Sequence, residues 1–76
     1  MTKLTRAINP MPEDVRVALD QNGLEAAYAA RPDYQQNDYL GWISRAKREE
    51  TRLKRLNQML DELKRGGVYM NMAWHG

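Results

Sequence analysis

Residues 39–65 read YLGWISRAKREETRLKRLNQMLDELKR, and this stretch decides the fold. In its second half, four leucines recur at spacings of three, four and three residues, which gives a helix one apolar face for packing. They are Leu53, Leu56, Leu60 and Leu63, and Met59 widens the face. Gly66-Gly67 follows and ends the helix, because glycine readily adopts the left-handed conformation of a helix end.

The first half of the stretch carries a second apolar face, in which Trp42 is the largest side chain. Its members recur at helical spacing and are Tyr39, Trp42, Ile43 and Ala46. We interpret Trp42 as core, in preference to a binding hot spot, because it lies at the centre of this face. Gly41 costs about 1 kcal/mol relative to alanine inside a helix. It either lets another segment approach closely or is simply tolerated.

No breaker marks whether residues 39–65 form one helix or two, because residues 47–50 contain neither Gly nor Pro. One unbroken rod could not fold back to bury its own leucine face, so we place a break near Lys47–Arg48. The first of the two helices begins at Asp33, which we expect to cap it together with Gln36. The two helices form a scaffold around Trp42, Ile43, Leu53, Leu56, Leu60 and Leu63.

Two shorter helices precede this scaffold. Pro12 suits the first position of a helix, and Gly23 ends that helix. A second helix covers residues 24–30 and stops at Arg31-Pro32, because the residue before a proline avoids the helical region. The predicted fold class is all-α, a small bundle of three to four helices with an extended C-terminal tail. The chain divides into a flexible lead-in at residues 1–10, one helical domain at 11–67 and the tail at 68–76.

The tail begins as VYMNMAW at residues 68–74, which alternates in the period of a β-strand. We find no second strand candidate that could pair with it, and a lone strand is unstable in water. The tail therefore lies in a groove on the helices, pairs with another chain or frays. Its candidate contact residues are Met70, Met72 and Trp74.

The chain of 76 residues lacks the residue sets that catalysis and metal binding require. Cysteine is absent, Ser44 is the only serine, and the one histidine, His75, lies in the tail. Nucleophilic catalysis needs an activated nucleophile beside a base, and metal sites need clustered ligands at suitable spacing. We therefore predict no enzyme activity, no catalytic residues, no cofactor and no metal.

Export and membrane insertion are not indicated either. The first residues, MTKLTRAINP, form no signal peptide, because Pro10 and Pro12 come before any apolar region. No apolar run approaches the roughly 20 residues that span a bilayer. We expect a soluble protein of the bacterial cytoplasm.

Positive charge is concentrated in residues 45–65, which hold eight basic and four acidic residues, a net charge of +4. The rest of the chain holds four basic and six acidic residues, a net charge of −2. The candidate interaction edge consists of Arg45, Arg48, Arg52, Arg55 and Lys54. These side chains either bind phosphates or carboxylates of a partner, or cover the leucine face and pair with acidic residues of the first helix. We favour the second interpretation for Arg52 and Arg55, because such surface pairs are common in helical domains.

Several ordered motifs resemble one protein family. DYLGWI at residues 38–43 is followed by Ala46-Lys47 and by ETRLKR at residues 50–55, and Met11-Pro12-Glu13-Asp14 opens a helix upstream. Over roughly residues 10–65 the chain resembles the bacteriocin-protection family, also called the YdeI or OmpD-associated (OmdA) family, and the Tyr69-Met70-x-Met72 tail fits some members. Many members carry a β-rich domain before this helical part, so we expect the chain to correspond to the helical module alone.

The resemblance implies a helical fold and a link to protection against bacteriocins and antimicrobial peptides, with no catalytic residue or cofactor to carry over. We predict a non-enzymatic interaction module whose partner is a protein. Nucleic acid bound by the basic edge is the alternative, and that binding would weaken with salt. An anionic membrane surface is the least favoured partner, because the core needs the leucine face. These patterns leave the partner's identity and the oligomeric state open.

Overall fold

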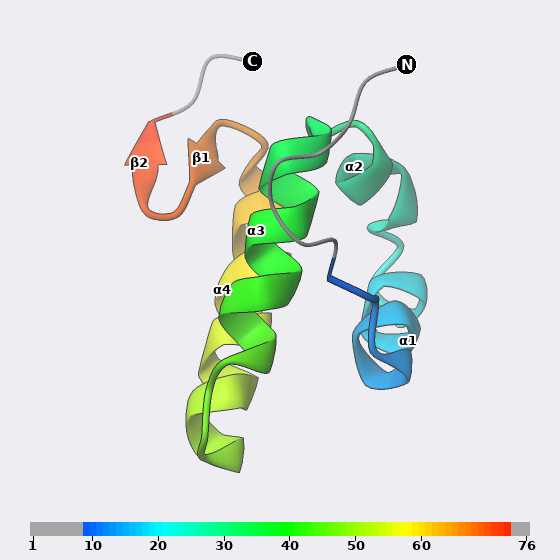
Figure 1. Ribbon diagram of the computed structural model, residues 1–76. Helices are drawn as coiled ribbons and strands as arrows, with labels where there is room; N and C mark the ends of the chain where they lie inside the picture. The colour runs from blue at the N-terminus through cyan, green and yellow to red at the C-terminus, as the bar shows by residue number, and fades with distance from the viewer. Residues whose placement is uncertain (1–8, 74–76) are drawn as a thin grey trace, which may run out of the picture.

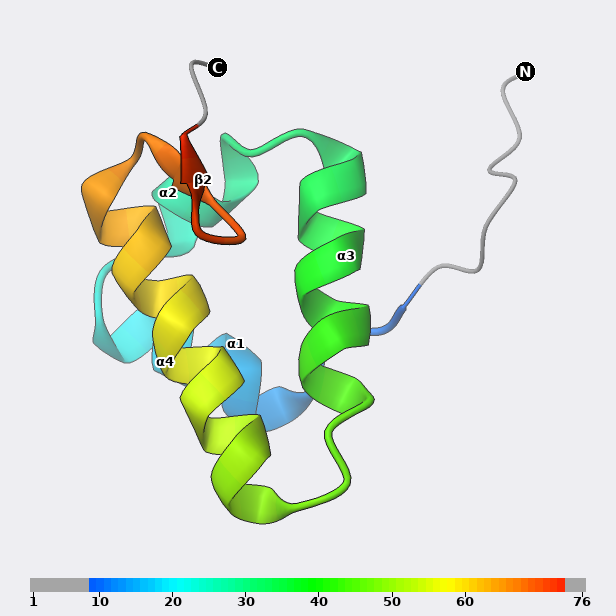
Figure 2. The ribbon, with the colours of Figure 1, turned by 90° about the vertical axis from the view of Figure 1, so that its left-hand side faces the viewer.

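A computed structural model describes residues 9–73 of the chain. Its elements are α1 (Glu13–Gln21), α2 (Glu25–Ala29), α3 (Asp33–Ser44), α4 (Glu49–Arg65), β1 (Val68–Tyr69) and β2 (Met72–Ala73) (Figure 1). Helices α3 and α4 run in opposite directions as a pair, α1 and α2 cover one side of it, and the strands lie on the other side (Figures 1 and 2). The mostly helical fold predicted from the sequence is confirmed.

The first helix begins at Glu13, one residue after the start that the sequence predicts at Pro12. Pro12 precedes it in extended conformation, and Glu13 and Asp14 occupy the first turn, where the helix dipole favours negative charge. Gly23 then adopts a φ of +65°, which glycine reaches without strain, and the chain turns into α2. Val15 and Leu19 are buried, so α1 contributes one apolar stripe to the core.

The chain between α3 and α4 breaks close to the predicted place. Helix α3 ends at Ser44 and α4 begins at Glu49, with Arg48 extended before it, so the break near Lys47–Arg48 is confirmed. The predicted cap at the start of α3 is wrong. Asp33 is already helical and makes no capping hydrogen bond, while the Gln36 side chain donates to the Arg31 carbonyl at 2.8 Å. Pro32 occupies the cap position, and its missing N–H removes one donor that would need a partner.

The core lies between the α3–α4 pair and the two short helices. Of the predicted scaffold, Ile43, Leu56, Leu60 and Leu63 are buried, but Leu53 is 45 % exposed. The centre of the buried face of α4 lies on the Met59 side of the leucine row, about 70° around the helix from Leu53 at 100° per residue. The buried apolar residues are Val15, Leu19, Leu24, Tyr28, Tyr39, Leu40, Ile43, Leu56, Met59, Leu60 and Leu63.

The C-terminal segment is a β-hairpin up to residue 73, so the predicted extended tail without a strand partner is wrong. Strands β1 and β2 pair antiparallel, with Val68 opposite Ala73 and Tyr69 opposite Met72. Met70 and Asn71 form the turn with φ values of 51° and 65°, as a two-residue hairpin turn of type I′ requires. The alternating sequence continues through the turn and hides it, and Asn71 is the one local signal, because asparagine tolerates positive φ.

Candidate interaction surface

An open groove of about 560 Å³ lies over the solvent-facing side of α4 and the end of α3. Helix α4 supplies most of its lining, because residues three or four positions apart share one face of a helix. The lining residues are Trp42, Thr51, Lys54, Arg55, Asn57, Gln58 and Asp61. The groove therefore combines one aromatic ring with charged and hydrogen-bonding side chains.

Trp42 and Arg55 form a unit that joins the two long helices at this groove. The Arg55 guanidinium carbon lies 5.3 Å from the centre of the Trp42 ring, within the range of a cation–π interaction. Arg55 Nη1 also donates a hydrogen bond of 2.6 Å to the Trp42 carbonyl oxygen. The Ala46 N–H, which would reach that oxygen in a longer helix, bonds to Ile43 instead. Arg55 thus satisfies a carbonyl at the C-terminal end of α3, where the helix dipole also favours a cation.

Trp42 is therefore not the centre of the core. Its side chain is partly buried and packs against the core from the edge. Gln35, Tyr39 and Ile43 follow one another at intervals of four residues and are fully buried, so they define the middle of the inner face of α3. Trp42 lies about 60° from Tyr39 around the helix at 100° per residue, beside that face.

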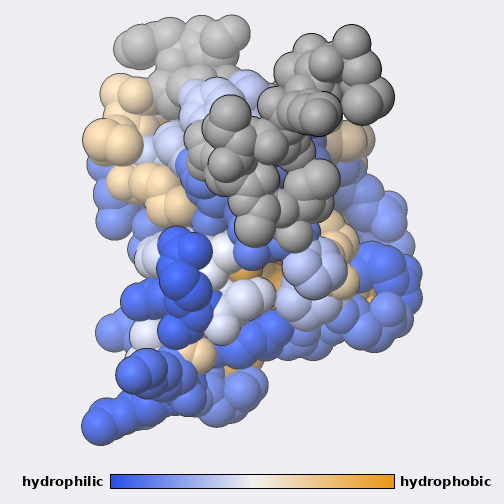
Figure 3. All heavy atoms as spheres, in the orientation of Figure 1, coloured by the Kyte–Doolittle hydropathy of each residue, from blue (hydrophilic) through white to orange (hydrophobic). Residues whose placement is uncertain are grey.

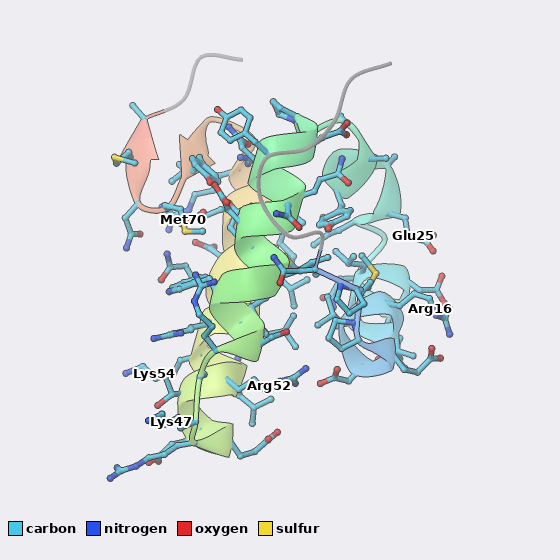
Figure 4. The ribbon with its side chains drawn as sticks, viewed as in Figure 1. Arg16, Glu25, Lys47, Arg52, Lys54 and Met70 are labelled. Atoms are coloured by element: carbon cyan, nitrogen blue, oxygen red, sulfur yellow. The ribbon has the colours of Figure 1, made fainter. Side chains whose placement is uncertain are left out.

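Arg52 leaves the predicted basic edge and binds α1. Its Nη1 and Nη2 both donate to the Asp14 carboxylate, the second at 3.0 Å, which confirms the expected pairing with an acidic residue of the first helix. The hydrogen bond from Arg52 holds the pKa of Asp14 below its ordinary value. Arg55, which was expected to do the same, binds Trp42 instead. Figure 4 shows Arg52 on the side of α4 that faces α1 and Lys54 on the opposite side.

The remaining cations of the predicted edge also lie apart. Arg48 is exposed, and its Nη1 is 3.8 Å from Glu50 Oε1. Arg45 Nη1 lies at the end of α3 beside Gly41, where it would be 2.9 Å from an added Cβ. The side-chain nitrogen of Asn9 would be only 2.8 Å from the same Cβ, so Gly41 does allow the close approach of another segment. Of the five predicted edge residues, only Lys54 and Arg55 line the groove.

The predicted tail contacts divide between the core and the surface. Met70 packs against the core, whereas the Met72 side chain is 60 % exposed. Trp74 lies outside the described residues. Apolar surface gathers over the hairpin, at the upper left of Figure 3, while the rest of that face is largely hydrophilic.

A buried carboxylate that the sequence patterns did not reveal holds the hairpin against the helices. Glu62 is 1 % exposed and accepts four hydrogen bonds from described residues. The donors are the hydroxyl of Tyr39, Gln58 Nε2 at 3.0 Å, and the backbone N–H groups of Met70 and Asn71 at 2.8 and 2.9 Å. One side chain thus joins α3, α4 and the hairpin turn.

The hydrogen bonds also set the charge of this carboxylate. Burial alone raises the pKa of Glu62, but the bonds from Tyr39, Asn71 and Met70 outweigh it and hold the pKa below its ordinary value. Burial and the bond to Glu62 raise the pKa of Tyr39 above its ordinary value. The pair is therefore an ionised carboxylate with a neutral phenol at neutral pH.

A buried arginine extends the same network. Arg31 is 4 % exposed, its Nη1 donates to Gln35 Oε1 at 3.1 Å, and its Nη2 donates to the Glu62 carbonyl at 3.0 Å. Only folding brings these residues together, because Arg31 and Glu62 are 31 positions apart in the sequence. The one available signal was the position of Glu62 next to the leucine face.

Residues 9–73 contain no group of three or more His, Asp or Glu side chains placed to hold a metal ion. Within the same residues, no helix combines the length and the apolar character that crossing a membrane requires.

Comparisons with known proteins place the chain in a family. Neither the curated proteins nor the solved structures gave a significant match. The family model described as bacteriocin-protection, YdeI or OmpD-associated matches residues 10–66, which include helices α1 to α4 and Trp42. The match covers most of the 76 residues, so this protein belongs to the bacteriocin-protection, YdeI or OmpD-associated family.

Proposed function

We propose that this protein is a non-enzymatic helical interaction module of the bacterial cytoplasm that binds another protein through the α3–α4 groove. The proposed role of this contact is the bacteriocin protection that the family's description names. The observation that carries the proposal is the groove itself, where the Trp42–Arg55 unit lies on two packed helices. Tryptophan and arginine are among the residues most enriched at the centres of protein interfaces.

The use of the buried polar groups supports a role without catalysis. Glu62 and Tyr39 form a buried pair of titratable side chains. They are hydrogen-bonded to each other, and Glu62 also accepts hydrogen bonds from the backbone of the hairpin turn. The lowered pKa of Glu62 makes its carboxylate a weak base, whereas a general base works best with a pKa near the operating pH. Neither group lines the groove.

Nucleic-acid binding by the basic edge gains no specific support. Three of its five cations take different partners: Arg52 binds Asp14, Arg55 binds Trp42, and Arg48 lies near Glu50. A phosphate backbone is bound most readily by a continuous row of cations.

Capture from a bacterial lysate tests the proposal. The full chain is immobilised beside Trp42→Ala, which removes the ring, and Thr51→Trp, which fills the groove from the outer side of α4 without adding charge. Met72→Ala, on the exposed hairpin, is the matched control. We expect one or more proteins that the unchanged chain and Met72→Ala retain and that both groove variants lose.

Circular dichroism of each variant shows whether it is folded. If Trp42→Ala does not fold, Thr51→Trp still tests the groove. The proposal is wrong if no protein is retained specifically, or if the folded groove variants retain the same proteins as the control.

A further inference from the structure

We propose that the occupant of the α3–α4 groove is an acidic, extended segment of the partner protein. Its carboxylates bind Lys54 and Arg55, and a neighbouring apolar side chain packs on the exposed edge of Trp42. This inference rests on the proposed function and names the chemistry of the partner.

The charge of the groove favours an acidic ligand. Lys54 makes no hydrogen bond or ion pair with any other residue of the described part of the chain, so its ammonium group is available. Asp61 is the one acidic residue in the lining, and Arg65 Nη2 lies 3.1 Å from its Oδ2. This neighbouring cation offsets the Asp61 charge, and Lys54 and Arg55 leave the groove positive.

Arg55 is held ready for a carboxylate. Its contact with the Trp42 ring and its bond to the Trp42 carbonyl fix the guanidinium before any ligand arrives. A guanidinium has five N–H donors in a planar fork, and the bond to Trp42 involves only Nη1. Planar donors fixed in this way suit a carboxylate, and the ligand does not have to order them.

The length of the groove limits the size of the segment. Thr51 and Asp61 mark its ends along α4, and ten helical residues rise by about 15 Å. An extended peptide of about five residues covers the same distance. Thr51, Asn57 and Gln58 line the path and supply hydrogen-bonding groups for such a backbone.

The same geometry disfavours a nucleic-acid strand. Single strands bind by stacking bases on aromatic faces along a row of cations. Here the Arg55 guanidinium already lies over the Trp42 ring, and Arg52 is turned toward Asp14. A short acidic peptide needs only the two cations that the groove retains.

A peptide titration of the ¹⁵N-labelled full chain tests the inference. The probe is acetylated and amidated Glu-Leu-Glu-Leu-Glu, and the matched control peptide is Gln-Leu-Gln-Leu-Gln. We expect saturable NMR shifts at the Trp42 indole N–H and at residues 51–61 with the acidic peptide only. Because the interface is small, we expect a dissociation constant on the order of 1 mM.

Two lysine-to-glutamate variants distinguish binding of the peptide in the groove from general attraction between the acidic peptide and the basic helix. Lys54→Glu removes a groove cation, whereas Lys47→Glu changes an exposed lysine between α3 and α4 that does not line the groove. We expect Lys54→Glu to weaken peptide binding about tenfold or more, the effect of losing one charge-assisted hydrogen bond. Lys47→Glu should change the binding less than about twofold, because exposed charges at a distance are screened by salt.

Three results would overturn the inference. They are no saturable shift with the acidic peptide, equal binding of the glutamine peptide, and equal weakening by the two lysine variants. Tighter binding of an oligothymidylate to the same residues at matched salt would also overturn it and would favour nucleic acid. None of these results decides the proposed function, which the lysate capture tests separately, because its readout does not depend on the chemistry of the ligand.

Discussion

At the scale of single residues, Glu62 explains why a short hairpin is ordered on a helical bundle. Its carboxylate is buried, yet four donors from two helices and the hairpin turn satisfy it. Burying an unpartnered carboxylate would cost several kcal/mol, whereas a fully hydrogen-bonded one is tolerated. Glu62 is therefore a structural residue, although its type suggests a solvated helix surface.

Replacing this carboxylate by an amide should destabilise the fold. In Glu62→Gln, an NH₂ group replaces one of the two carboxylate oxygens. This group cannot accept the hydrogen bonds that the oxygen accepts, so at least one buried donor loses its acceptor. We expect the free energy of unfolding to fall by about 1–3 kcal/mol, the usual cost of leaving a buried polar group unsatisfied. Urea unfolding measures it, and Glu49→Gln on exposed α4 surface is the control, with a change below about 0.5 kcal/mol. Equal effects of the two variants would contradict the role of Glu62.

The same residue should give the protein a pH dependence with a definite sign. Because the folded state holds the pKa of Glu62 below the ordinary value of 4.5, its contribution to stability is fully present above that pH. The contribution is lost as the pH falls through the lower pKa of the folded state. Asp14 contributes in the same direction, but it is exposed and its effect is screened.

Unfolding by urea at neutral pH and at several values below pH 4.5 checks this sign. We expect the stability of the unchanged protein to fall on acidification and that of Glu62→Gln to fall less. The linkage to Glu62 is disproved if the two curves stay parallel.

At the scale of the elements, the hairpin depends on its contacts with α3 and α4. Two paired strands of two residues each would not be stable alone in water. Tyr69 packs edge-on against Tyr39 with ring centres 5.4 Å apart, and its hydroxyl donates to Asp38 Oδ2 at 2.8 Å. Together with the turn amides on Glu62, these contacts replace the neighbouring strands that a larger sheet would provide.

The turn itself supplies a test of the hairpin. Asn71 has a φ of 65°, a conformation that β-branched residues adopt only with strain. We expect Asn71→Val to destabilise the fold by about 1–2 kcal/mol, and Asn71→Gly to be neutral or stabilising. Thermal unfolding measures the stabilities, and hydrogen exchange at the Met70 amide reports the turn. A turn that tolerates valine as well as glycine would speak against this hairpin.

At the scale of the whole molecule, the core occupies one side of α4 and the groove the other. The inner side packs against α1, α2 and α3, so the apolar residues there are committed to the fold. The outer side carries the groove, whose lining includes two residues that also support the fold: Arg55 donates to the Trp42 carbonyl and Gln58 donates to Glu62. The apolar core and the groove therefore occupy opposite sides of the same helix.

Two leucines of α4, one buried and one exposed, mark the edge of the core, and substituting each of them tests where that edge lies. Leu56 is 6 % exposed and Leu53 is 45 % exposed, although both belong to the same leucine row. We expect Leu56→Ala to cost about 2–4 kcal/mol, because it leaves a cavity in a small core, and Leu53→Ala to cost less than about 1 kcal/mol. Chemical denaturation of both variants measures the difference, and similar costs would place Leu53 in the core after all.

Local patterns in the chain were enough to predict the helical class, the break before Glu49 and the turn at Gly23 that follows α1. These features depend on neighbouring residues, through helical spacing and backbone preferences. The same patterns failed where they were ambiguous. A period of two residues does not distinguish one strand from two joined by Met70-Asn71, and an apolar row does not show which part a neighbour covers.

Only the packing of distant segments decided the candidate site. The sequence of a charged helix does not show whether its arginines contact a ligand, α1 or a tryptophan of α3. In the folded protein, Arg52 binds Asp14, Arg55 lies over the Trp42 ring and Lys54 lines the groove. The fold also places Arg31, Tyr39 and the hairpin turn against Glu62. Arg31 and Tyr39 are each more than twenty residues from Glu62 in the sequence. Side-chain partners at such separations depend on three-dimensional proximity, which no local pattern encodes.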